Sequence, residues 1–226
     1  MPDVDVRFAQ KPDVRELSRV LGRAFFDDPV MMWMVPDDAK RARALPLVFG
    51  AMTRHHFLGN GAVQVADRAG NSAGAGRAGN SAGAGRAGNS AGAGAIGAAA
   101  LWDPPGQWKQ TPREELRMMP SFLRAMGLQV GRGMGISELM KKHHPEEPHW
   151  YLGVIGSDPD VRGGGFGHAL MTSRLDRCDK EGAPAYLESS KESNVPYYMR
   201  FGFEVTGELT IPDGGPTMWQ MWRRPG

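Results

Sequence analysis

A run of glycines between a predicted strand and a predicted helix constrains this chain more than any other feature. Residues 155–167 hold five glycines, after an apolar stretch and before a segment with helical spacing. The first N–H groups of a helix lack intrahelical acceptors and lie at the positive end of its dipole, so they can bind a phosphate. Glycine has no Cβ to keep the phosphate away. The segment predicts a phosphate-binding loop in an α/β fold, with a merely flexible loop as the alternative.

Two other phosphate loops are excluded. The chain has no Gly-x-x-x-x-Gly-Lys-Ser/Thr sequence, and the Gly-x-Gly-x-x-Gly spacing fails because His168 occupies its last position. The loop therefore predicts neither a P-loop nucleotide site nor a dinucleotide site.

Length and composition predict one domain, 1–226, in a reducing compartment. The 27 basic and 25 acidic residues are interspersed, with a net charge of +2, which argues against a nucleic-acid partner. The single cysteine, Cys178, excludes an intramolecular disulfide and is expected in the core. Residues 1–7 do not resemble a signal peptide, and no stretch reaches the roughly 20 apolar residues of a membrane span. We expect a cytoplasmic protein without a membrane partner.

Residues 68–94 are three copies of the nonapeptide Arg-Ala-Gly-Asn-Ser-Ala-Gly-Ala-Gly. Such a segment has few side chains that can form a core and many glycines, so it predicts a disordered loop within the domain. Each copy contains Gly-x-Ser-x-Gly, the pattern of a serine hydrolase nucleophile elbow, around Ser72, Ser81 and Ser90. An elbow needs a buried strand before the serine and a helix after it, and both are missing here.

The remaining residues predict an α/β (α+β) domain in which the repeat is the tip of a β-hairpin. In the first half we expect a strand at 4–9, a helix opened by a capping box from Asp13 to Glu16, and a helix at 38–57 with a possible kink at Pro46. The hairpin arms are 62–66 and 95–102. In the second half the expected elements are a helix from Thr111 that breaks near Pro120 and ends at the glycines of 127–135, a turn at 143–148, strands at 149–157, 185–189, 203–211 and 217–222, and helices at 166–181 and 195–201, the latter capped by Asn194.

The glycine loop also carries a family resemblance. Arg162-x-x-Gly165-x-Gly167, after a strand and an Asp-Pro turn, resembles the Gln/Arg-x-x-Gly-x-Gly/Ala motif of the GNAT superfamily of N-acetyltransferases, which binds the pyrophosphate of CoA. The resemblance implies a mixed, mostly antiparallel central sheet flanked by helices, with acetyl-CoA as the acetyl donor. Similarity to the puromycin N-acetyltransferases extends over patches at 24–29, 100–102, 143–150 and 187–203, and the repeat has no counterpart there.

The resemblance also implies the catalytic groups and the cofactor contacts. Tyr198 matches the tyrosine that faces the thioester sulfur, where its O–H can protonate the departing thiolate, and Tyr197 is then the structural tyrosine. Glu188 is the candidate base, and an amide of Ile155 or Gly156 the candidate oxyanion donor. For both Tyr198 and Glu188 a structural role is the alternative. The implied cofactor contacts are Ile155, Gly156, Ser157, Arg162, Gly163, Gly164, Gly165, Phe166, Gly167, His168 and Asn194.

In this fold the acceptor pocket is built largely by the first two helices and their loop. Aromatic residues and methionines cluster there, namely Phe25, Phe26, Met31, Met32, Trp33 and Met34. Trp102, Trp150 and Tyr151 can add aromatic walls, although plain core packing is the alternative. Asp27 and Asp28 can hold a cationic amine. The puromycin enzymes have a tyrosine at Asp28, so puromycin itself is not implied. The predicted substrate contacts are Phe26, Asp28, Trp33, Trp102 and Trp150.

No metal site is expected. The pairs at 55–56 and 143–144 are the only adjacent histidines, neighbouring residues on a helix point apart, and no third ligand has a suitable spacing.

The leading hypothesis is direct transfer of an acetyl group from acetyl-CoA to a primary amine of a small, partly aromatic molecule, antibiotic-like or amino-acid-like. One alternative is a protein lysine or N-terminal acetyltransferase, which predicts an open acidic groove. The other is a non-catalytic acetyl-CoA sensor. We expect a monomer or a homodimer.

Overall fold

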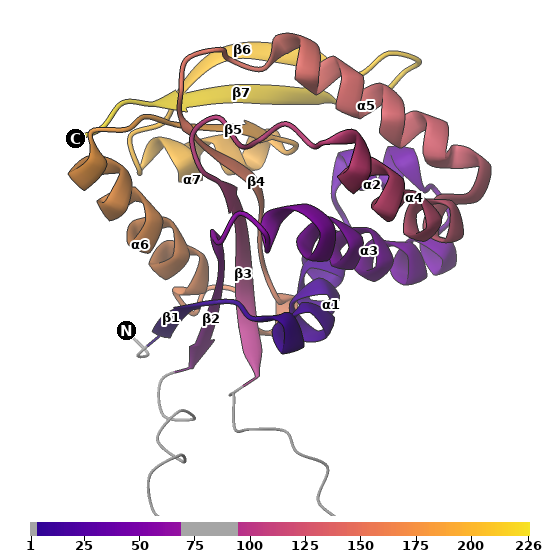
Figure 1. Ribbon diagram of the computed structural model, residues 1–226, viewed down its shortest axis with the longest axis horizontal. Coiled ribbons are helices and arrows are strands. Elements are labelled where there is room, and N and C mark those ends of the chain that lie inside the picture. The colour runs from indigo at the N-terminus through magenta and orange to yellow at the C-terminus, as the bar shows by residue number, and fades with distance from the viewer. Residues whose placement is uncertain (1–3, 69–94) are drawn as a thin grey trace, which may run out of the picture.

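One mixed sheet organises the part of the chain that the computed structural model describes, residues 4–68 and 95–226. Its seven strands lie in the order β1-β2-β3-β4-β5-β7-β6 (Figure 1). Neighbouring strands are antiparallel, except that β4 and β5 run parallel. This confirms the predicted mixed, mostly antiparallel sheet. The strands are Val4–Phe8 (β1), Val63–Arg68 (β2), Ile96–Asp103 (β3), Trp150–Ser157 (β4), Ala185–Ser189 (β5), Glu204–Thr210 (β6) and Thr217–Arg223 (β7).

Helices cover both faces of the sheet (Figure 1). Every residue of β3 is buried, because alternate side chains enter two different cores. Ala98 and Ala100 pack with the residues of α6, whereas Ala99 and Leu101 pack with those of α1 and α3. The helices are Val14–Ala24 (α1), Pro29–Met34 (α2), Asp38–Met52 (α3), Pro112–Met126 (α4), Val130–His143 (α5), Phe166–Glu181 (α6) and Val195–Met199 (α7).

The predicted capping box from Asp13 to Glu16 is wrong. The Asp13 carboxylate accepts the Gln10 N–H at 2.7 Å and the Arg7 guanidinium at 2.8 Å, so it caps a 3₁₀ turn at Lys11–Asp13 that leads into α1. Glu16 instead accepts the N–H of Ile96 at the start of β3. Tertiary partners thus take both carboxylates away from the local motif.

Helix α4 ends at Met126 with Gly127 as its C-cap, in agreement with the prediction that it ends at the glycines of 127–135. The sequence did not predict the next helix: a 3₁₀ turn at Gly127–Gln129 joins α4 to α5, and α5 runs through three glycines. A Cβ on Gly133 would make ordinary contacts with Met34 and Met126, so α5 packs beside α2 and α4 at this glycine. The predicted break at Pro120 is wrong, since α4 continues through that residue.

The helix predicted at 38–57 is confirmed. It consists of α3, which has Pro46 inside it, and of a π-helical turn at Thr53–Phe57 that follows directly. Strands β2 and β3 pair as the arms of the predicted hairpin. The repeat of residues 68–94 lies outside the described residues, apart from Arg68 at the end of β2. No described helix is long and apolar enough to span a membrane.

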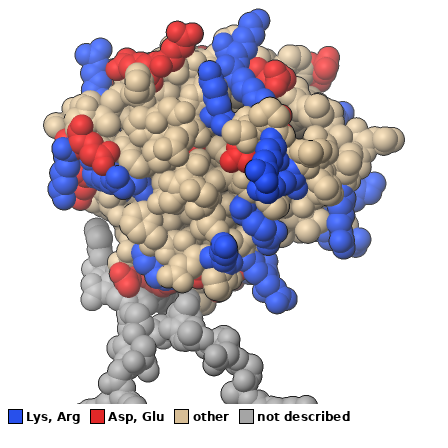
Figure 2. Space-filling model, viewed as in Figure 1, with Lys and Arg blue, Asp and Glu red and all other residues tan. Residues whose placement is uncertain are grey.

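The charged side chains are mixed on the face shown in Figure 2. Acidic groups are scattered among the basic ones, and a broad uncharged surface lies between them. This distribution agrees with the small net charge of +2.

Gly97 of β3 sets the position at which α6 begins. A Cβ at residue 97 would lie 2.6 Å from the ring of Phe166, the first residue of α6. We therefore expect Gly97→Ala to lower the free energy of unfolding by about 1–3 kcal/mol through overpacking. Chemical denaturation measures the change. Gly131→Ala in α5 is the control, because a Cβ there meets nothing within 4 Å, and it should leave stability unchanged or raise it by up to about 1 kcal/mol. Equal stability of the two variants would contradict this packing.

Candidate functional site

The site opens where β4 parts from β5. Their pairing covers only Trp150–Leu152 and Ala185–Leu187. Strand β4 continues to Ser157, but over these later residues it pairs with β3 alone. The edge of β4 that faces β5 thus has free backbone groups from Gly153 onward, which include Ile155, Gly156 and Ser157, three of the cofactor contacts that the resemblance implies.

The glycine loop follows directly on this free edge. Gly163 and Gly165 have φ angles of 81° and 83°, in the left-handed region that favours glycine. Gly165 is the N-cap of α6 and has no side chain to bond the first helical N–H groups. Phe166 is buried in the core and anchors the start of the helix. The loop is therefore a cradle of free amides at a helix N-terminus, which fits an anionic diphosphate.

Charged side chains tie the loop to the end of α1. The Arg162 guanidinium donates to the Ala24 carbonyl at 3.2 Å and lies 3.9 Å from the Asp27 carboxylate. Lys191 lies 3.0 Å from the same carboxylate, and its hydrogen bond lowers the pKa of Asp27. Asp27 is therefore already paired with two cations, so the suggestion that it holds the acceptor amine does not fit.

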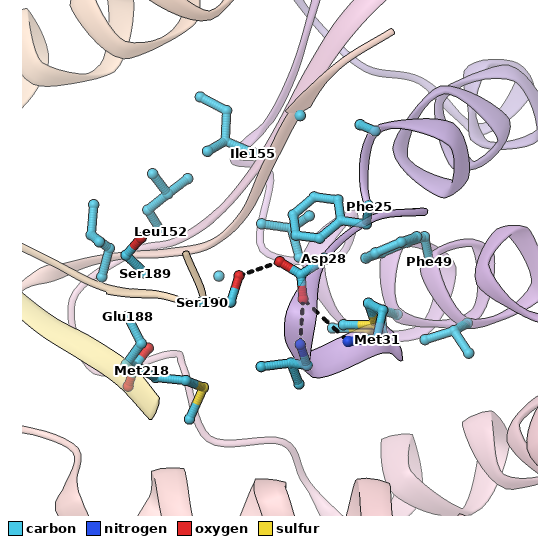
Figure 3. Close-up of a pocket in the computed structure, with 18 of the residues that line it drawn as sticks. Phe25, Asp28, Met31, Phe49, Leu152, Ile155, Glu188, Ser189, Ser190 and Met218 are labelled. Atoms are coloured by element: carbon cyan, nitrogen blue, oxygen red, sulfur yellow. Dashed lines mark hydrogen bonds between the residues drawn. The ribbon is translucent and has the colours of Figure 1, made fainter. Parts of the chain in front are cut away.

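A cavity of about 1440 Å³ connects the loop with the space between α2, α4 and α5. It is bounded by the free edge of β4, the loop, β5 and α7, and Figure 3 shows Ile155, Leu152 and Glu188 around it. All the predicted cofactor contacts line it except Gly164, whose N–H bonds the Val161 carbonyl. Glu188 and Tyr198, from different elements, line the same cavity.

The Glu188 carboxylate is buried at the end of the β4–β5 pairing. Its side chain is 2% exposed, and neither oxygen has a partner in hydrogen-bond geometry among the described residues. Burial raises the pKa of Glu188 to about 7, although the nearby hydroxyls of Tyr151 and Tyr186 oppose the shift. A carboxyl group of this kind can gain or lose a proton near neutral pH.

Tyr198 and Tyr197 lie side by side on α7 but face different parts of the cavity. Burial, followed by the nearby Tyr197 and Asp28, raises the pKa of Tyr198, so its hydroxyl stays protonated. The Tyr197 hydroxyl is close to the glycine loop, since a Cβ on Gly167 would lie 3.1 Å from it. Asn194 is the N-cap residue of α7, as predicted, but its side chain makes no capping hydrogen bond. Asn194 lines the cavity instead.

Asp28 lies in the cavity wall but serves α2. One carboxylate oxygen accepts the N–H groups of Val30 and Met31 at 3.0 and 3.2 Å, and the other accepts the Ser190 hydroxyl (Figure 3). Asp28 is thus the N-cap of α2 and joins it to the turn after β5. Burial raises the pKa of its carboxyl group.

The other predicted acceptor contacts do not line the cavity. Trp102 and Trp150 pack in the core beneath α6, because successive strand residues point to opposite faces, and their neighbours Asp103 and Tyr151 face the cavity. The Phe26 ring packs on the Arg41 guanidinium and the Trp33 ring on that of Arg132. These four residues therefore pack against other side chains, which was the alternative to a role in binding the acceptor.

Methionines line the cavity together with aromatic residues, among them Phe25, Phe49 and Phe122. The methionines come from α2, α3, α4, α5 and β7, where Figure 3 shows Met31 and Met218 as examples. The thioether side chain is unbranched and adapts its shape, so such a wall suits an apolar ligand without dictating one outline. The methionines that line the cavity are Met31, Met34, Met52, Met118, Met119, Met126, Met134, Met140 and Met218.

Two buried histidines also face the cavity. Burial alone would lower the pKa of His56, but the carboxylates of Asp103, at 3.1 Å, and Glu114, at 3.4 Å, outweigh burial and raise it. His144 stacks on Trp108, and burial lowers its pKa to about 3. Within residues 4–68 and 95–226, no three His, Cys, Asp or Glu side chains come together as a metal site.

Comparison with known proteins agrees with this geometry. Residues 97–203, from β3 to just past α7, match the model of the Acetyltransferase (GNAT) family. An uncharacterised N-acetyltransferase of Schizosaccharomyces pombe is 26% identical over 193 residues, which cover 84% of this chain and 70% of that protein.

Two solved structures share the fold. An acetyltransferase of Corynebacterium glutamicum, named histone acetyltransferase HPA2 and related acetyltransferase, superposes with a TM-score of 0.70 at 23% identity, over 100% of this chain and 98% of the other. A Drosophila melanogaster polyamine N-acetyltransferase, which forms N-acetylagmatine, gives 0.59 at 14% identity, over 98% and 100%.

A cradle for a diphosphate, a free strand edge beside it and a buried carboxylate in one cavity are features that suit an acyl-CoA-dependent transferase. The family match, which covers residues 97–203, agrees with this geometry and makes the chain similar to GNAT-type N-acetyltransferases, a family that uses acetyl-CoA as its acetyl donor.

Proposed function

We propose that this enzyme acetylates a primary amine of a small molecule with an apolar or aromatic body. The observation that carries the proposal is the continuity of the cavity. The glycine loop and the free edge of β4 lie at one end, Glu188 and Tyr198 lie on its wall, and the methionines surround the other end. A donor and an acceptor can therefore meet beside the two titratable groups.

The chain's own groups can perform each proton transfer. Acetyl-CoA supplies the acetyl group as a thioester. The loop amides bind its diphosphate, and the edge of β4 from Ile155 to Ser157 bonds its pantetheine arm. Glu188 accepts a proton from the acceptor ammonium, which frees the nitrogen lone pair for attack on the thioester carbonyl carbon. The C–N bond forms, the C–S bond breaks, and the Tyr198 hydroxyl gives its proton to the departing sulfur. The nitrogen then loses its second proton, which returns through water to the Tyr198 oxygen, so that a neutral amide and a thiol leave the site.

The lining of the acceptor end supports a small apolar amine over a protein substrate. A lysine side chain in a polypeptide needs an open acidic groove, whereas here nine methionines and several phenylalanines line the cavity and Asp27 is paired with Lys191. Among proteins of this fold, the Drosophila enzyme acts on a small amine. The similarity to puromycin N-acetyltransferases supports the same class of acceptor, a small amine. The acceptor differs from puromycin, because Asp28, which caps α2, occupies the position at which those enzymes have a tyrosine.

A panel of amines tests the proposal. Release of CoA from acetyl-CoA should be fastest with primary arylalkylamines and alkylamines, slower with compact polar amines, and slowest with a lysine-containing peptide, because only an apolar body gains from leaving water in this cavity. Calorimetric titration with acetyl-CoA is the parallel measurement. Binding of acetyl-CoA without turnover of any amine would exclude the enzymatic proposal, and a preference for the peptide would exclude the acceptor class.

The role of Tyr198 predicts a selective loss of rate. Tyr198→Phe removes the proton donor and keeps the ring, so kcat should fall by about 10²- to 10⁴-fold while the affinity for acetyl-CoA changes little. Tyr197→Phe is the matched control and should retain most of the kcat. Unchanged kcat in Tyr198→Phe would remove this residue from the mechanism.

The role of Glu188 predicts a dependence on pH. Because the base acts only when ionised and its pKa is about 7, kcat/KM should rise with pH through about 7 and then level off. Glu188→Gln should lower the level that kcat/KM reaches at high pH by about 10²-fold or more, and it should abolish the rise through pH 7, the acidic limb of the profile. Glu192→Gln, on the exposed turn after β5, is the control and should keep the wild-type profile. A Glu188→Gln variant with the wild-type limb would assign the limb to another group.

A further inference from the structure

The imidazole rings of His144 and His149 form a hydrogen-bonded pair directly behind Glu188. Their Nε2 atoms lie 3.0 Å apart, and the Nδ1 atom of His144 lies 3.8 Å from the Glu188 carboxylate. All three side chains are buried. The pair comes from the turn between α5 and β4, outside the segments from which the proposed catalytic groups come.

The positions of the protons in this pair follow from one carbonyl group. The Nδ1 atom of His149 bonds the Glu147 carbonyl oxygen, which can only accept, so His149 carries its proton on Nδ1. A neutral His149 then has a bare Nε2. Between two facing Nε2 atoms one must donate, so His144 carries its proton on Nε2 and leaves Nδ1 bare toward Glu188.

Both rings are neutral at the pH of an assay. Burial, then His149 and Lys109, lowers the pKa of His144 to about 3. Burial also lowers the pKa of His149, although the Glu147 carbonyl opposes the shift. The tautomers deduced from the hydrogen bonds therefore hold across the range in which Glu188 titrates.

Aromatic packing fixes the orientation of the His144 ring. It stacks on Trp108 at a centroid distance of 3.7 Å, and it meets Tyr151 and Tyr186 edge-on at 4.8 and 5.1 Å. The ring cannot turn its Nε2–H toward Glu188 without leaving both this stack and the hydrogen bond to His149.

We propose that His144 is a positioning residue that holds a bare nitrogen toward Glu188, and that His149 selects this tautomer through the Glu147 carbonyl. The inference rests on the proposed function of Glu188 as the base. Once Glu188 has taken a proton from the acceptor ammonium, its new O–H faces the His144 Nδ1 atom, which lies 3.8 Å away, just outside hydrogen-bond distance, so a small movement of the carboxyl group lets it donate to that nitrogen. The ionised carboxylate faces a lone pair instead, so the arrangement favours proton uptake.

The other groups around Glu188 act in known directions. Tyr151 of β4 and Tyr186 of β5 offer hydroxyls that favour the ionised form. Strand β7 presents the neutral Gln220, which donates to the Tyr186 oxygen at 2.9 Å. The positive charge of Lys109 acts on His144, where it helps to lower the pKa of the ring. The bare His144 nitrogen is therefore the neighbour that favours the protonated acid.

Nitrogen-15 NMR of the wild-type protein with labelled histidine tests the tautomers directly. At neutral pH, His144 should carry its proton on Nε2 and His149 on Nδ1, with His144→Gln and His149→Gln samples for assignment. A proton on Nδ1 of His144 would overturn the proposal. This measurement needs no turnover, so it is independent of whether Glu188 is the base, which Glu188→Gln decides.

Variants of His149 test the effect on the base. In His149→Phe the His144 ring loses its acceptor and can carry its proton on Nδ1, where it donates to the carboxylate and lowers the pKa of Glu188. The acidic limb of kcat/KM should then move down by about one pH unit. His149→Gln keeps an acceptor oxygen for the His144 Nε2–H and should restore the limb.

A matched control separates this effect from lost packing. Trp222→Phe alters a ring that contacts both His149 and Tyr186 but holds no proton of the pair, so its limb should stay at the wild-type pH. A limb that is the same in His149→Phe and His149→Gln, or that moves equally in Trp222→Phe, would overturn the role of the pair.

Discussion

The structure depends on strand β4, which stays paired with β3 along its length but separates from β5 after three residues. Strand β4 stays hydrogen-bonded to β3 up to Ser157, while its pairing with β5 ends at Leu152. Free backbone groups in a protein interior need partners, so this edge is stable only beside water or a ligand. The divergence creates the cavity, places the glycine loop at its mouth and leaves Glu188 just beyond the last paired residue of β5.

The charged groups of the site are arranged by depth. At the mouth, Arg162 and Lys191 share Asp27, so cationic groups surround the loop without being isolated. Deeper in the cavity, His144 is neutral because its pKa is lowered, and Glu188 can become neutral near pH 7 because its pKa is raised. The arrangement thus suits an anionic donor held near water, and proton transfer by the proposed base in a place where few charges compete.

The second half of the fold was predictable because its signals are local. The boundaries of α6 and β5 agree with the sequence, since Gly165 and Gly182 mark the helix ends and apolar spacing marks the rest. The mixed, mostly antiparallel sheet and the cofactor were expected from a family resemblance. Predictions from local sequence were wrong where contacts between separate segments determine the structure. The Asp13 carboxylate binds Arg7 instead of capping α1, and α5 forms in spite of its glycines because it packs on α2. The acceptor wall was missed because alternation alone does not say which face of a strand meets α6, as Trp150 and Tyr151 illustrate.

The methionine lining has a consequence for how this enzyme can change over evolutionary time. In a pocket walled by branched or aromatic side chains, the outline of the ligand is fixed by the backbone that carries them. Here nine unbranched thioethers form part of the outline, and their rotamers rearrange without moving a helix. A lineage can therefore change the shape of the cavity by small substitutions among these residues, while the sheet, the loop and Glu188 keep their geometry.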